Sequence, residues 1–527
     1  MQRTGLSRRE ALAAGVAGTA LAASAALASV QSGDAIDRIV SDFMAAFEIP
    51  GVAVALVRPG APVLARGFGV RRLGDAAPVD SDTLFAIASN SKSFTAAAIA
   101  LLVERGKLEW DAPVIRFMPD FAMHDQAVTQ LMTVRDLLCH RSGLPLGAGD
   151  LMQFPLGNRK RAEFLAGLRY LKPARGFRTG YDYDNILYVI AGILIERVSG
   201  LSWEDFITRE LLVPLGMKGA AAGPEAVKSA NLAARHARLG PPTRGFGTLE
   251  VVEPDEDPAA SPAGGIHASV TDIAPWLATQ LRQGVTPAGR RLWSAKNATE
   301  MWTPQVITAA TTGGTADNPV RPVLASYALG WFVADYRGRR FVYHGGALSG
   351  QITQTALLPE QGIGLAVFTN VEGRTPVVGL RNALLDHVLG IGGFDWLAAT
   401  RRQLDEENRA TLAQISTGDF KPPPGGPSLP LAAYVGRYRD TWYGDIVVTE
   451  RSGRLFVDFT RTPVFKSLLE PFGPDTFRTR FAKGAGEDAV VRFVVEDGKT
   501  ARLALKPLSP LADFSYDFQH LEPVRVP

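Results

Sequence analysis

Strand-like segments lie at both ends of the first 400 residues, and a helix-rich stretch separates them. Near the start, GVAVALVRPG and APVLARGFGV are apolar runs joined by a Pro-Gly turn, a pattern typical of a β-hairpin. Four further apolar runs, ALGWFVADY, RRFVYHGG, QTALLPE and IGLAVFTN, follow between residues 328 and 370. We therefore expect an α/β (α+β) fold in which one sheet is assembled from both ends of this region and helices pack against it.

Two segments show the pattern of helices that contact a core. Residues 36–47, IDRIVSDFMAAF, place apolar side chains three and four positions apart. Residues 185–200, NILYVIAGILIERVSG, are mostly apolar and end at Gly200, a residue type that commonly terminates helices. Both segments are predicted to be helices of the first domain.

The composition changes at KPPPGGPSLP, residues 421–430, which has the proline and glycine content of a linker. Beyond it the patterns are almost entirely those of strands, with hairpin turns predicted at Ser452-Gly453 and Asp497-Gly498. We expect a first domain at 33–400, a linker at 401–431, and a small all-β domain at 432–527 that is a barrel or a sandwich.

The N-terminus has the layout of an export signal. Residues 1–28 combine a basic start, a small-residue apolar run and an Ala-Leu-Ala site, and the paired Arg8 and Arg9 resemble a twin-arginine signal. A membrane anchor is the alternative, but the run is short and mostly alanine. We expect a periplasmic or secreted protein with no membrane span after signal removal. Its one cysteine, Cys139, excludes an intrachain disulfide.

The charge balance argues against nucleic-acid binding. The chain has 56 basic and 53 acidic residues, a net charge of +3, and no dense basic patch.

The segment SNSK places Ser89 and Lys92 three residues apart. If a helix begins at Ser89, both side chains lie on one face of it. A lysine that burial has deprotonated can accept the proton of the serine hydroxyl, and the free N–H groups of a helix N-terminus suit a developing oxyanion. The pattern alone also fits an ordinary helix start with a solvated lysine.

Two later segments add groups of the same chemistry. Tyr183 and Asn185 form a Tyr-x-Asn triplet directly before the predicted helix. The phenol could act as an acid or base, and the amide could orient Lys92 or hold a substrate amide. His344-Gly345-Gly346 ends a predicted strand, where glycines allow close approach to a ligand and the imidazole could donate to a substrate carboxylate or to Tyr183.

These three motifs, in this order, resemble the class C β-lactamase-like and penicillin-binding-protein-like serine hydrolases, the peptidase S12 family. The segments DTLFAIASNSKSFTA, LMTVRDLLCHRSGLP and SPAGGIHASVTDIAPWL are similar to that family, and residues 432–527 resemble the lipocalin-like domains often appended to it. The resemblance implies a serine β-lactamase-like fold, an antiparallel sheet with a helical domain, and a site between them. It implies Ser89 as the acylated nucleophile and no metal or organic cofactor. Lys92 and Tyr183 would share general-base and general-acid duty. Substrate binding would fall to Asn185, His344, Gly345 and Gly346, and the oxyanion hole to the backbone N–H groups of Ser89 and Ala347.

The family cleaves peptides, amides, esters and β-lactams, so the substrate stays open. Dedicated β-lactamases carry Lys-Thr-Gly where this chain has His344-Gly345-Gly346, and a histidine is neutral for much of the time at pH 7. The first expectation is a peptidase or amidase for small or linear peptides, including ones with D- or unusual residues. A carboxylesterase is second, and a β-lactamase or a sensor that acylates without turnover are further alternatives. His267, in PAGGIHAS, could lie at the edge of the site, and a homo-oligomer is left open.

Overall fold

The structure is a computed structural model that describes residues 34–416 and 423–527. The predicted export signal, residues 1–28, lies outside these ranges. Residues 36–47 are helical, as the apolar spacing predicted.

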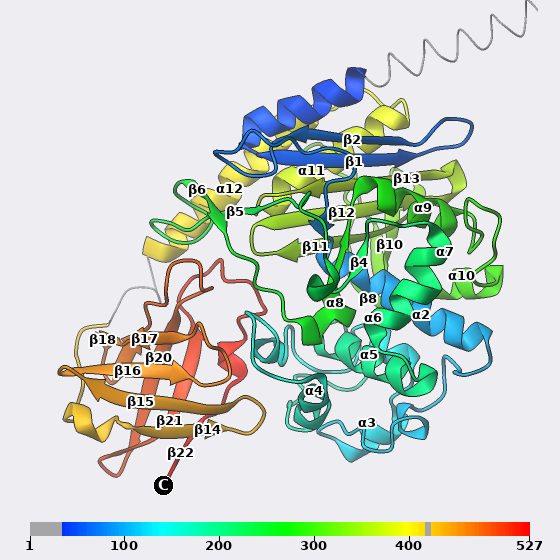
Figure 1. The fold of residues 1–527 in the computed structure, drawn as a ribbon. Helices are drawn as coiled ribbons and strands as arrows, with labels where there is room; N and C mark the ends of the chain where they lie inside the picture. The colour runs from blue at the N-terminus through cyan, green and yellow to red at the C-terminus, as the bar shows by residue number, and fades with distance from the viewer. Residues whose placement is uncertain (1–33, 417–422) are drawn as a thin grey trace, which may run out of the picture.

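An eight-stranded antiparallel sheet forms the centre of the first domain (Figure 1). Both ends of the region contribute to it: β1 and β2 pair with each other as the predicted hairpin, and β1 also pairs with β13. The strand order is β2-β1-β13-β12-β11-β10-β9-β8. The strands are β1 (Gly51–Val57), β2 (Leu64–Gly69), β8 (Val306–Ala310), β9 (Leu324–Tyr327), β10 (Phe332–Tyr336), β11 (Arg339–Leu348), β12 (Gln351–Leu358) and β13 (Ile363–Thr369).

Helices cover both faces of this sheet (Figure 1). In β1, Val52, Val54 and Leu56 contact the cluster formed with residues 36–47 and α11 (Arg374–Val388), whereas Ala53 and Ala55 face the opposite cluster. That opposite face packs against α9 (Val270–Leu281). Because both faces are buried, β1 is apolar at nearly every position instead of alternating with polar residues.

The helical part of the domain lies below the sheet in Figure 1 and is built around α2 (Ser91–Glu104) and α5 (Ile186–Ser199). Every residue of α5 from Ile186 to Ile195 is buried. Among the described residues no single helix has the length and apolarity to cross a membrane, although α5 and residues 203–215 meet that test as a pair bent by 76°. The other helices are α3 (Gln126–Leu131), α4 (Arg161–Leu168), α6 (Trp203–Ile207), α7 (Val213–Leu215), α8 (Ser261–Gly264) and α10 (Ala295–Met301).

Two small sheets complete the strands of the first domain. A three-stranded sheet has the order β3-β7-β4, and β5 pairs with β6. Their bounds are β3 (Phe85–Ala86), β4 (Ala221–Ala222), β5 (Arg235–Arg238), β6 (Leu249–Val252) and β7 (Ile266–Ala268).

The C-terminal part is a nine-stranded antiparallel sheet that curls into a nearly closed barrel, which confirms the predicted all-β fold (Figure 1). Asp497 and Gly498 both have positive φ at the turn between β20 and β21, as a tight hairpin turn requires. The strand order is β17-β16-β15-β14-β22-β21-β20-β19-β18. The strands are β14 (Gly436–Asp440), β15 (Gly444–Arg451), β16 (Arg454–Phe459), β17 (Lys466–Leu468), β18 (Glu470–Gly473), β19 (Thr476–Arg478), β20 (Ala489–Glu496), β21 (Lys499–Pro507) and β22 (Val524–Val526).

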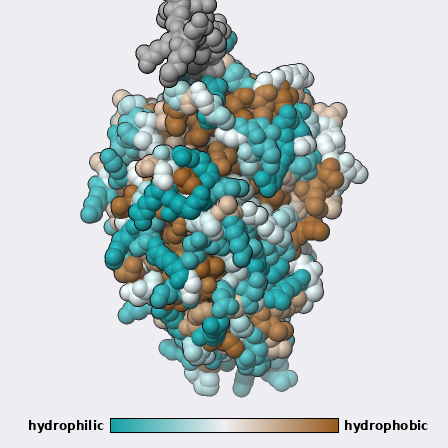
Figure 2. Space-filling view, turned by 90° about the vertical axis from the view of Figure 1, so that its right-hand side faces the viewer, coloured by the Kyte–Doolittle hydropathy of each residue, from teal (hydrophilic) through white to brown (hydrophobic). Residues whose placement is uncertain are grey.

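The boundary between the two parts differs from the prediction. Residues 401–416, assigned to the linker from the sequence, instead continue helix α12 (Trp396–Ser416), which packs on α11. The helix is mostly polar and exposed, so its apolar pattern is weak. Its buried residues are Trp396, Ala399, Thr400 and Thr411. Hydrophilic and hydrophobic residues are interspersed on the face that Figure 2 shows.

Candidate active site

Ser89 lies in a single 3-10 turn, Ala88–Asn90, and helix α2 begins only at Ser91. The sequence argument for a shared face had assumed a helix that begins at Ser89. The difference arises at Ala88, whose φ of +49° is a left-handed conformation that an alanine rarely adopts. Ala88 and Asn90 are buried while Ser89 is partly exposed, so Ser89 is the residue of this strained turn that solvent reaches.

Lys92, in the first turn of α2, is fully buried and has three neighbours for its amine. Its Nζ donates to Asn185 Oδ1 at 2.7 Å and to the backbone carbonyl of Ala263 at 2.8 Å. The third neighbour is Ser89 Oγ at 3.1 Å. A neutral amine has two N–H bonds and one lone pair. A protonated Lys92 donates to all three oxygens, whereas in a neutral Lys92 the two carbonyl oxygens can take both N–H groups and leave the lone pair for the Ser89 hydroxyl.

The electrostatics favour this neutral amine. Burial lowers the pKa of Lys92 from 10.5 to about 7, although the charges of Asp150 and Asp184 oppose the shift. The proton that a serine must lose therefore has an acceptor near neutral pH.

Tyr183 lies beside this pair. Lys92 Nζ is 4.9 Å from the centroid of the Tyr183 ring. The His140 ring also packs against the Tyr183 ring, with centroids 4.1 Å apart. Burial raises the pKa of Tyr183 well above 10, and a hydrogen bond with Ser89 opposes the rise. The free enzyme thus holds a neutral phenol, which suits a proton donor better than a base.

Asn185 is the residue just before α5, a position where asparagine often caps a helix. Its side chain makes no capping hydrogen bond here. The amide instead bridges two buried groups: Oδ1 accepts from Lys92, and Nδ2 donates to Asp150 Oδ2 at 2.8 Å. The structure therefore supports the predicted orienting role and adds Asp150, which sequence reasoning missed.

Strand β11 runs against the nucleophile turn at its glycines. A Cβ at Gly346 would lie 2.2 Å from the Ile87 carbonyl oxygen and 3.0 Å from Ala88 Cβ, so only glycine allows this approach. At Gly345 a Cβ would meet the end of the Gln354 side chain. Ala347, the next residue, is exposed. That the backbone N–H groups of Ala347 and Ser89 form an oxyanion hole stays a prediction.

His344 is buried, and both ring nitrogens are engaged within the fold. Nε2 lies 3.0 Å from the Tyr327 hydroxyl, and Nδ1 lies 2.7 Å from the Gly345 carbonyl oxygen. Burial and the Lys92 charge hold the pKa of His344 well below 6.5, so the ring is neutral. Contact with a substrate carboxylate would require breaking one of these bonds, and the arrangement favours an orienting role.

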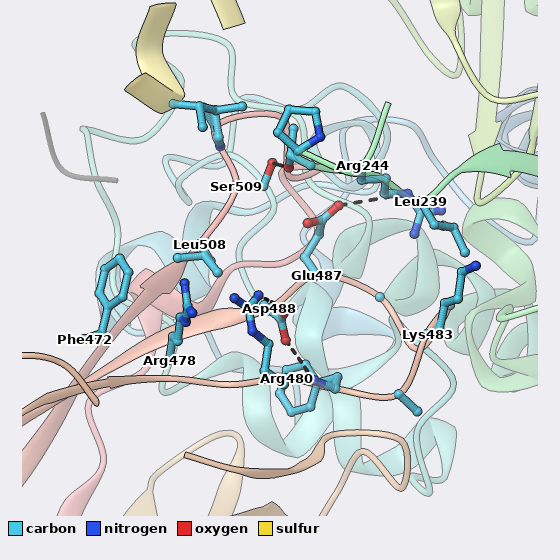
Figure 3. A pocket seen from close by; sticks show the side chains of 18 residues that line it. Leu239, Arg244, Phe472, Arg478, Arg480, Lys483, Glu487, Asp488, Leu508 and Ser509 are labelled. Carbon is cyan, nitrogen blue, oxygen red and sulfur yellow. Dashed lines mark hydrogen bonds and ion pairs between the residues drawn. The ribbon is translucent and has the colours of Figure 1, made fainter. Parts of the chain in front are cut away.

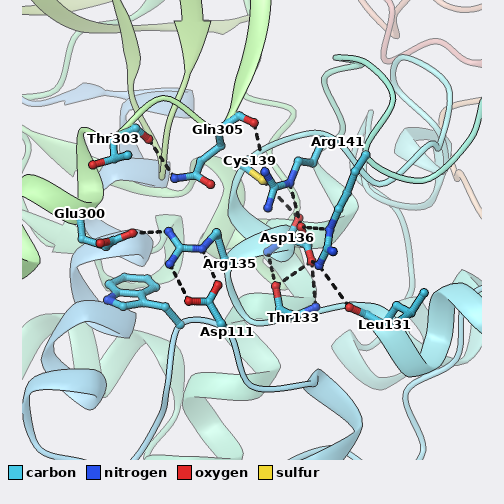
Figure 4. A network of polar contacts seen from close by, with 12 residues as sticks. Asp111, Leu131, Thr133, Arg135, Asp136, Cys139, Arg141, Glu300, Thr303 and Gln305 are labelled. Carbon is cyan, nitrogen blue, oxygen red and sulfur yellow. Dashed lines mark hydrogen bonds and ion pairs between the residues drawn. The ribbon is translucent and has the colours of Figure 1, made fainter.

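A polar network surrounds Asp136, four residues before His140 in the sequence (Figure 4). Asp136 is fully buried and accepts hydrogen bonds from Thr133, Arg141 and Arg178. Burial raises its pKa, but these hydrogen bonds outweigh the rise and leave the pKa below its usual value. Arg141 also donates to the backbone carbonyl of Gln305, the residue before β8, and so connects this network to the edge of the eight-stranded sheet (Figure 4).

His267 lies on β7, where it lines a cavity of about 1010 Å³ and its Nε2 is 3.4 Å from Glu256. Within residues 34–416 and 423–527, no group of three His, Cys, Asp or Glu side chains could hold a metal ion. Besides Asp150, sequence reasoning missed the Ala263 carbonyl, because no residue-type pattern marks a backbone acceptor.

Comparison with known proteins places this geometry in a family. Residues 36–390 match the family described as Beta-lactamase, and residues 421–524 match a domain of unknown function, DUF3471. An unguisins hydrolase of Aspergillus campestris is 28% identical over 455 residues, which cover 81% of this chain and 80% of that protein.

Solved structures agree with this placement. A D-amino acid amidase from Ochrobactrum anthropi SV3 is 26% identical with a TM-score of 0.52, covering 67% of this chain and 99% of that one. The octameric penicillin-binding protein homologue from Pyrococcus abyssi covers 93% of this chain and 99% of its own at a TM-score of 0.58, and its 23% identity shows a shared fold alone. Because the family match spans more than half of the chain and includes all three site motifs, this chain belongs to the β-lactamase family of serine hydrolases.

Proposed function

We propose that the protein hydrolyses amide bonds of small or linear peptides, including ones with D- or unusual residues, through an acyl-enzyme on Ser89. The observation that carries the proposal is the position of the buried Lys92 amine, 3.1 Å from Ser89 Oγ and in contact with two carbonyl acceptors that can hold both N–H groups of its neutral form. That arrangement activates a serine nucleophile without a metal or a histidine base.

In the acylation step, Ser89 Oγ bonds to the substrate carbonyl carbon as its proton passes to Lys92 Nζ. The negative charge on the carbonyl oxygen is stabilised by the backbone N–H groups of Ser89 and Ala347. The C–N bond then breaks, and Tyr183 gives its proton to the leaving nitrogen and recovers one from Lys92. In deacylation, water takes the place of the leaving amine and the same groups act in reverse.

The choice of an amide substrate draws on the relatives. One is named as a hydrolase of unguisins and another as a D-amino acid amidase. A neutral His344 in place of the lysine of dedicated β-lactamases removes the permanent cation that would pair with a β-lactam carboxylate.

We also propose export to the periplasm or beyond, on the strength of the twin-arginine pattern in residues 1–28. Replacing Arg8 and Arg9 together by lysine should retain the precursor inside the cell, and cell fractionation measures this.

The test compares the purified chain with Ser89→Ala on D- and L-phenylalanine amide, D- and L-aminoacyl p-nitroanilides, p-nitrophenyl acetate and nitrocefin. We expect turnover of at least one amide that disappears in Ser89→Ala, and a covalent adduct on Ser89 in a quenched reaction measured by intact mass. Hydrolysis of p-nitrophenyl acetate without hydrolysis of any amide would show that the protein is an esterase and not an amidase. Amide turnover that survives in Ser89→Ala would overturn the mechanism.

A further inference from the structure

The C-terminal barrel reaches the candidate active site through residues 513–518, which follow β21. The Phe514 ring lies edge-on to the Tyr183 ring, with centroids 5.7 Å apart. The Phe514 carbonyl packs against Gly147, where an added Cβ would be only 2.5 Å from it, and the Gly147 N–H donates to the Tyr183 carbonyl. This segment therefore touches the same loop that holds Tyr183.

Asp517, in the same segment, fixes the backbone of the turn that carries Asp150. It is fully buried, and its two carboxylate oxygens accept from the backbone N–H groups of Gly149 and Leu151, each at 2.9 Å. His520 Nδ1 lies 3.2 Å from Asp517 Oδ2. The residues on both sides of Asp150 are thus held by one side chain from the barrel.

Ser515 contacts Asp150 itself. Asp150 Oδ2 accepts from the Ser515 hydroxyl and from the Asn185 amide, both at 2.8 Å, and Oδ1 accepts from Gln153 at 2.7 Å. Since the Asn185 nitrogen is committed to Asp150, its oxygen is the end that faces Lys92.

The position of Asp150 is costly for a carboxyl group. Burial and the charge of the neighbouring Asp517 raise its pKa well above 3.8. A buried carboxyl without a role is disfavoured, because an apolar side chain would fill the same space without losing hydration. What the carboxyl provides that an apolar group would not is an acceptor for the Asn185 amide.

We propose that Asp150, held in place by Ser515 and Asp517 of the C-terminal barrel, is a positioning residue that sets the orientation of Asn185 and thereby the direction of the Lys92 lone pair. The barrel then completes the active site, and the chemistry depends on its docking. This inference rests on the proposed function, because it assigns a role in activating Ser89.

The test measures kcat and KM for an amide that the panel under Proposed function shows to be hydrolysed. The full-length protein is compared with its Ser515→Ala, Asp150→Asn and double variants. Ser509→Ala is the matched control, since Ser509 accepts a hydrogen bond from Thr243 across the same interface without contacting Asp150. Rates are measured only on variant protein that elutes from a size-exclusion column at the same volume as the wild type. We expect Ser515→Ala to lower kcat about tenfold with KM within about twofold, because small misplacements of reacting groups slow chemistry.

The double variant separates positioning through Asp150 from an independent effect. If Ser515 acts through Asp150, Ser515→Ala should cost no further kcat in the Asp150→Asn background. Multiplicative losses in the double variant, or a kcat for Ser515→Ala equal to that of Ser509→Ala, would overturn the inference. Ser89→Ala run in parallel distinguishes the two levels: if it keeps turnover the proposed function fails, and if it is inactive while Ser515→Ala matches wild type, only this inference fails.

Discussion

At the scale of single residues, the central observation is the environment of Lys92. An amine that is excluded from water and has only neutral hydrogen-bond partners is driven to lose its proton. Tyr183 is shifted the other way, toward the neutral phenol. One buried group thus accepts a proton near neutral pH and its neighbour keeps one, which is the division that acid–base catalysis needs.

The pKa of Lys92 predicts a pH profile. Because it is lowered to about 7, kcat/KM should fall by about tenfold for each pH unit below 7 as the amine becomes protonated. Initial rates between pH 5 and 9 measure this limb. Lys92→Arg is the control, since it keeps a cation that does not deprotonate and should lose about 10²–10⁴ in rate. An acidic limb that persists in Lys92→Arg would assign the titration to another group.

The role of Tyr183 as a proton donor predicts a dependence on the leaving group. Tyr183→Phe should slow amide hydrolysis by about 10²–10⁴, because an amine leaves only once it is protonated. The same variant should slow p-nitrophenyl ester hydrolysis far less, since p-nitrophenolate leaves without a proton. Equal losses on the two substrates would show that Tyr183 does not act as the acid for the leaving group.

At the scale of elements, the site depends on the contact between β11 and the turn Ala88–Asn90. Asn90 reinforces this contact: its amide donates to Thr353 on β12, and its oxygen accepts from Thr355. The nucleophile turn is therefore held by hydrogen bonds to β12 and by the close glycine approach of β11.

This contact predicts different outcomes for the two glycines. Gly346→Ala should strongly reduce activity, because the new methyl group meets backbone at Ile87 and must push β11 away from Ser89. Gly345→Ala should reduce activity less, since its methyl group meets the end of the Gln354 side chain and not the backbone of the nucleophile turn. Activity and melting temperature of both variants check this. A Gly346→Ala variant no worse than Gly345→Ala would contradict it.

At the scale of the whole molecule, the two domains share a buried charged interface. Arg244, from the loop between β5 and β6, pairs with Glu372 and faces Glu487 of the barrel at 3.9 Å (Figure 3). A cavity of about 400 Å³ lies beside this pair, lined by residues of both domains. Burial raises the pKa of Glu487 from 4.5 to about 7, although Arg244 opposes the shift.

This raised pKa predicts a pH-dependent stability. The folded state binds the Glu487 proton more tightly than the unfolded state, so the contribution is full below about pH 4.5 and is lost as the pH rises through 7. The loss amounts to about 3 kcal/mol of unfolding free energy. Glu487→Gln should therefore gain stability over wild type at pH 8 but not at pH 4.5, as urea unfolding would show. The exposed Glu450→Gln is the control, and an equal response of both variants would refute the prediction.

Much of the fold followed from local patterns. The hairpin of β1 and β2, helix α5 with its end at Gly200, and the turn at Asp497-Gly498 are all where the spacing of apolar residues and the turn chemistry predicted them. Helix α12 was missed over residues 401–416 because most of its surface is exposed and its apolar pattern is weak.

The sequence by itself indicated the family and the proposed chemistry, since Ser89, Lys92, Tyr183 and Asn185 stand in motifs whose residue types and spacing are recognisable. Only the tertiary structure decided how those side chains are oriented and which of them are protonated. The lone-pair direction of Lys92 depends on the Ala263 carbonyl, 171 residues away, and the orientation of Asn185 depends on Asp150 and on Ser515 in the other domain. Burial, which sets the pKa values of Lys92 and His344, is likewise a property of the packed chain, because desolvation comes from residues distant in sequence.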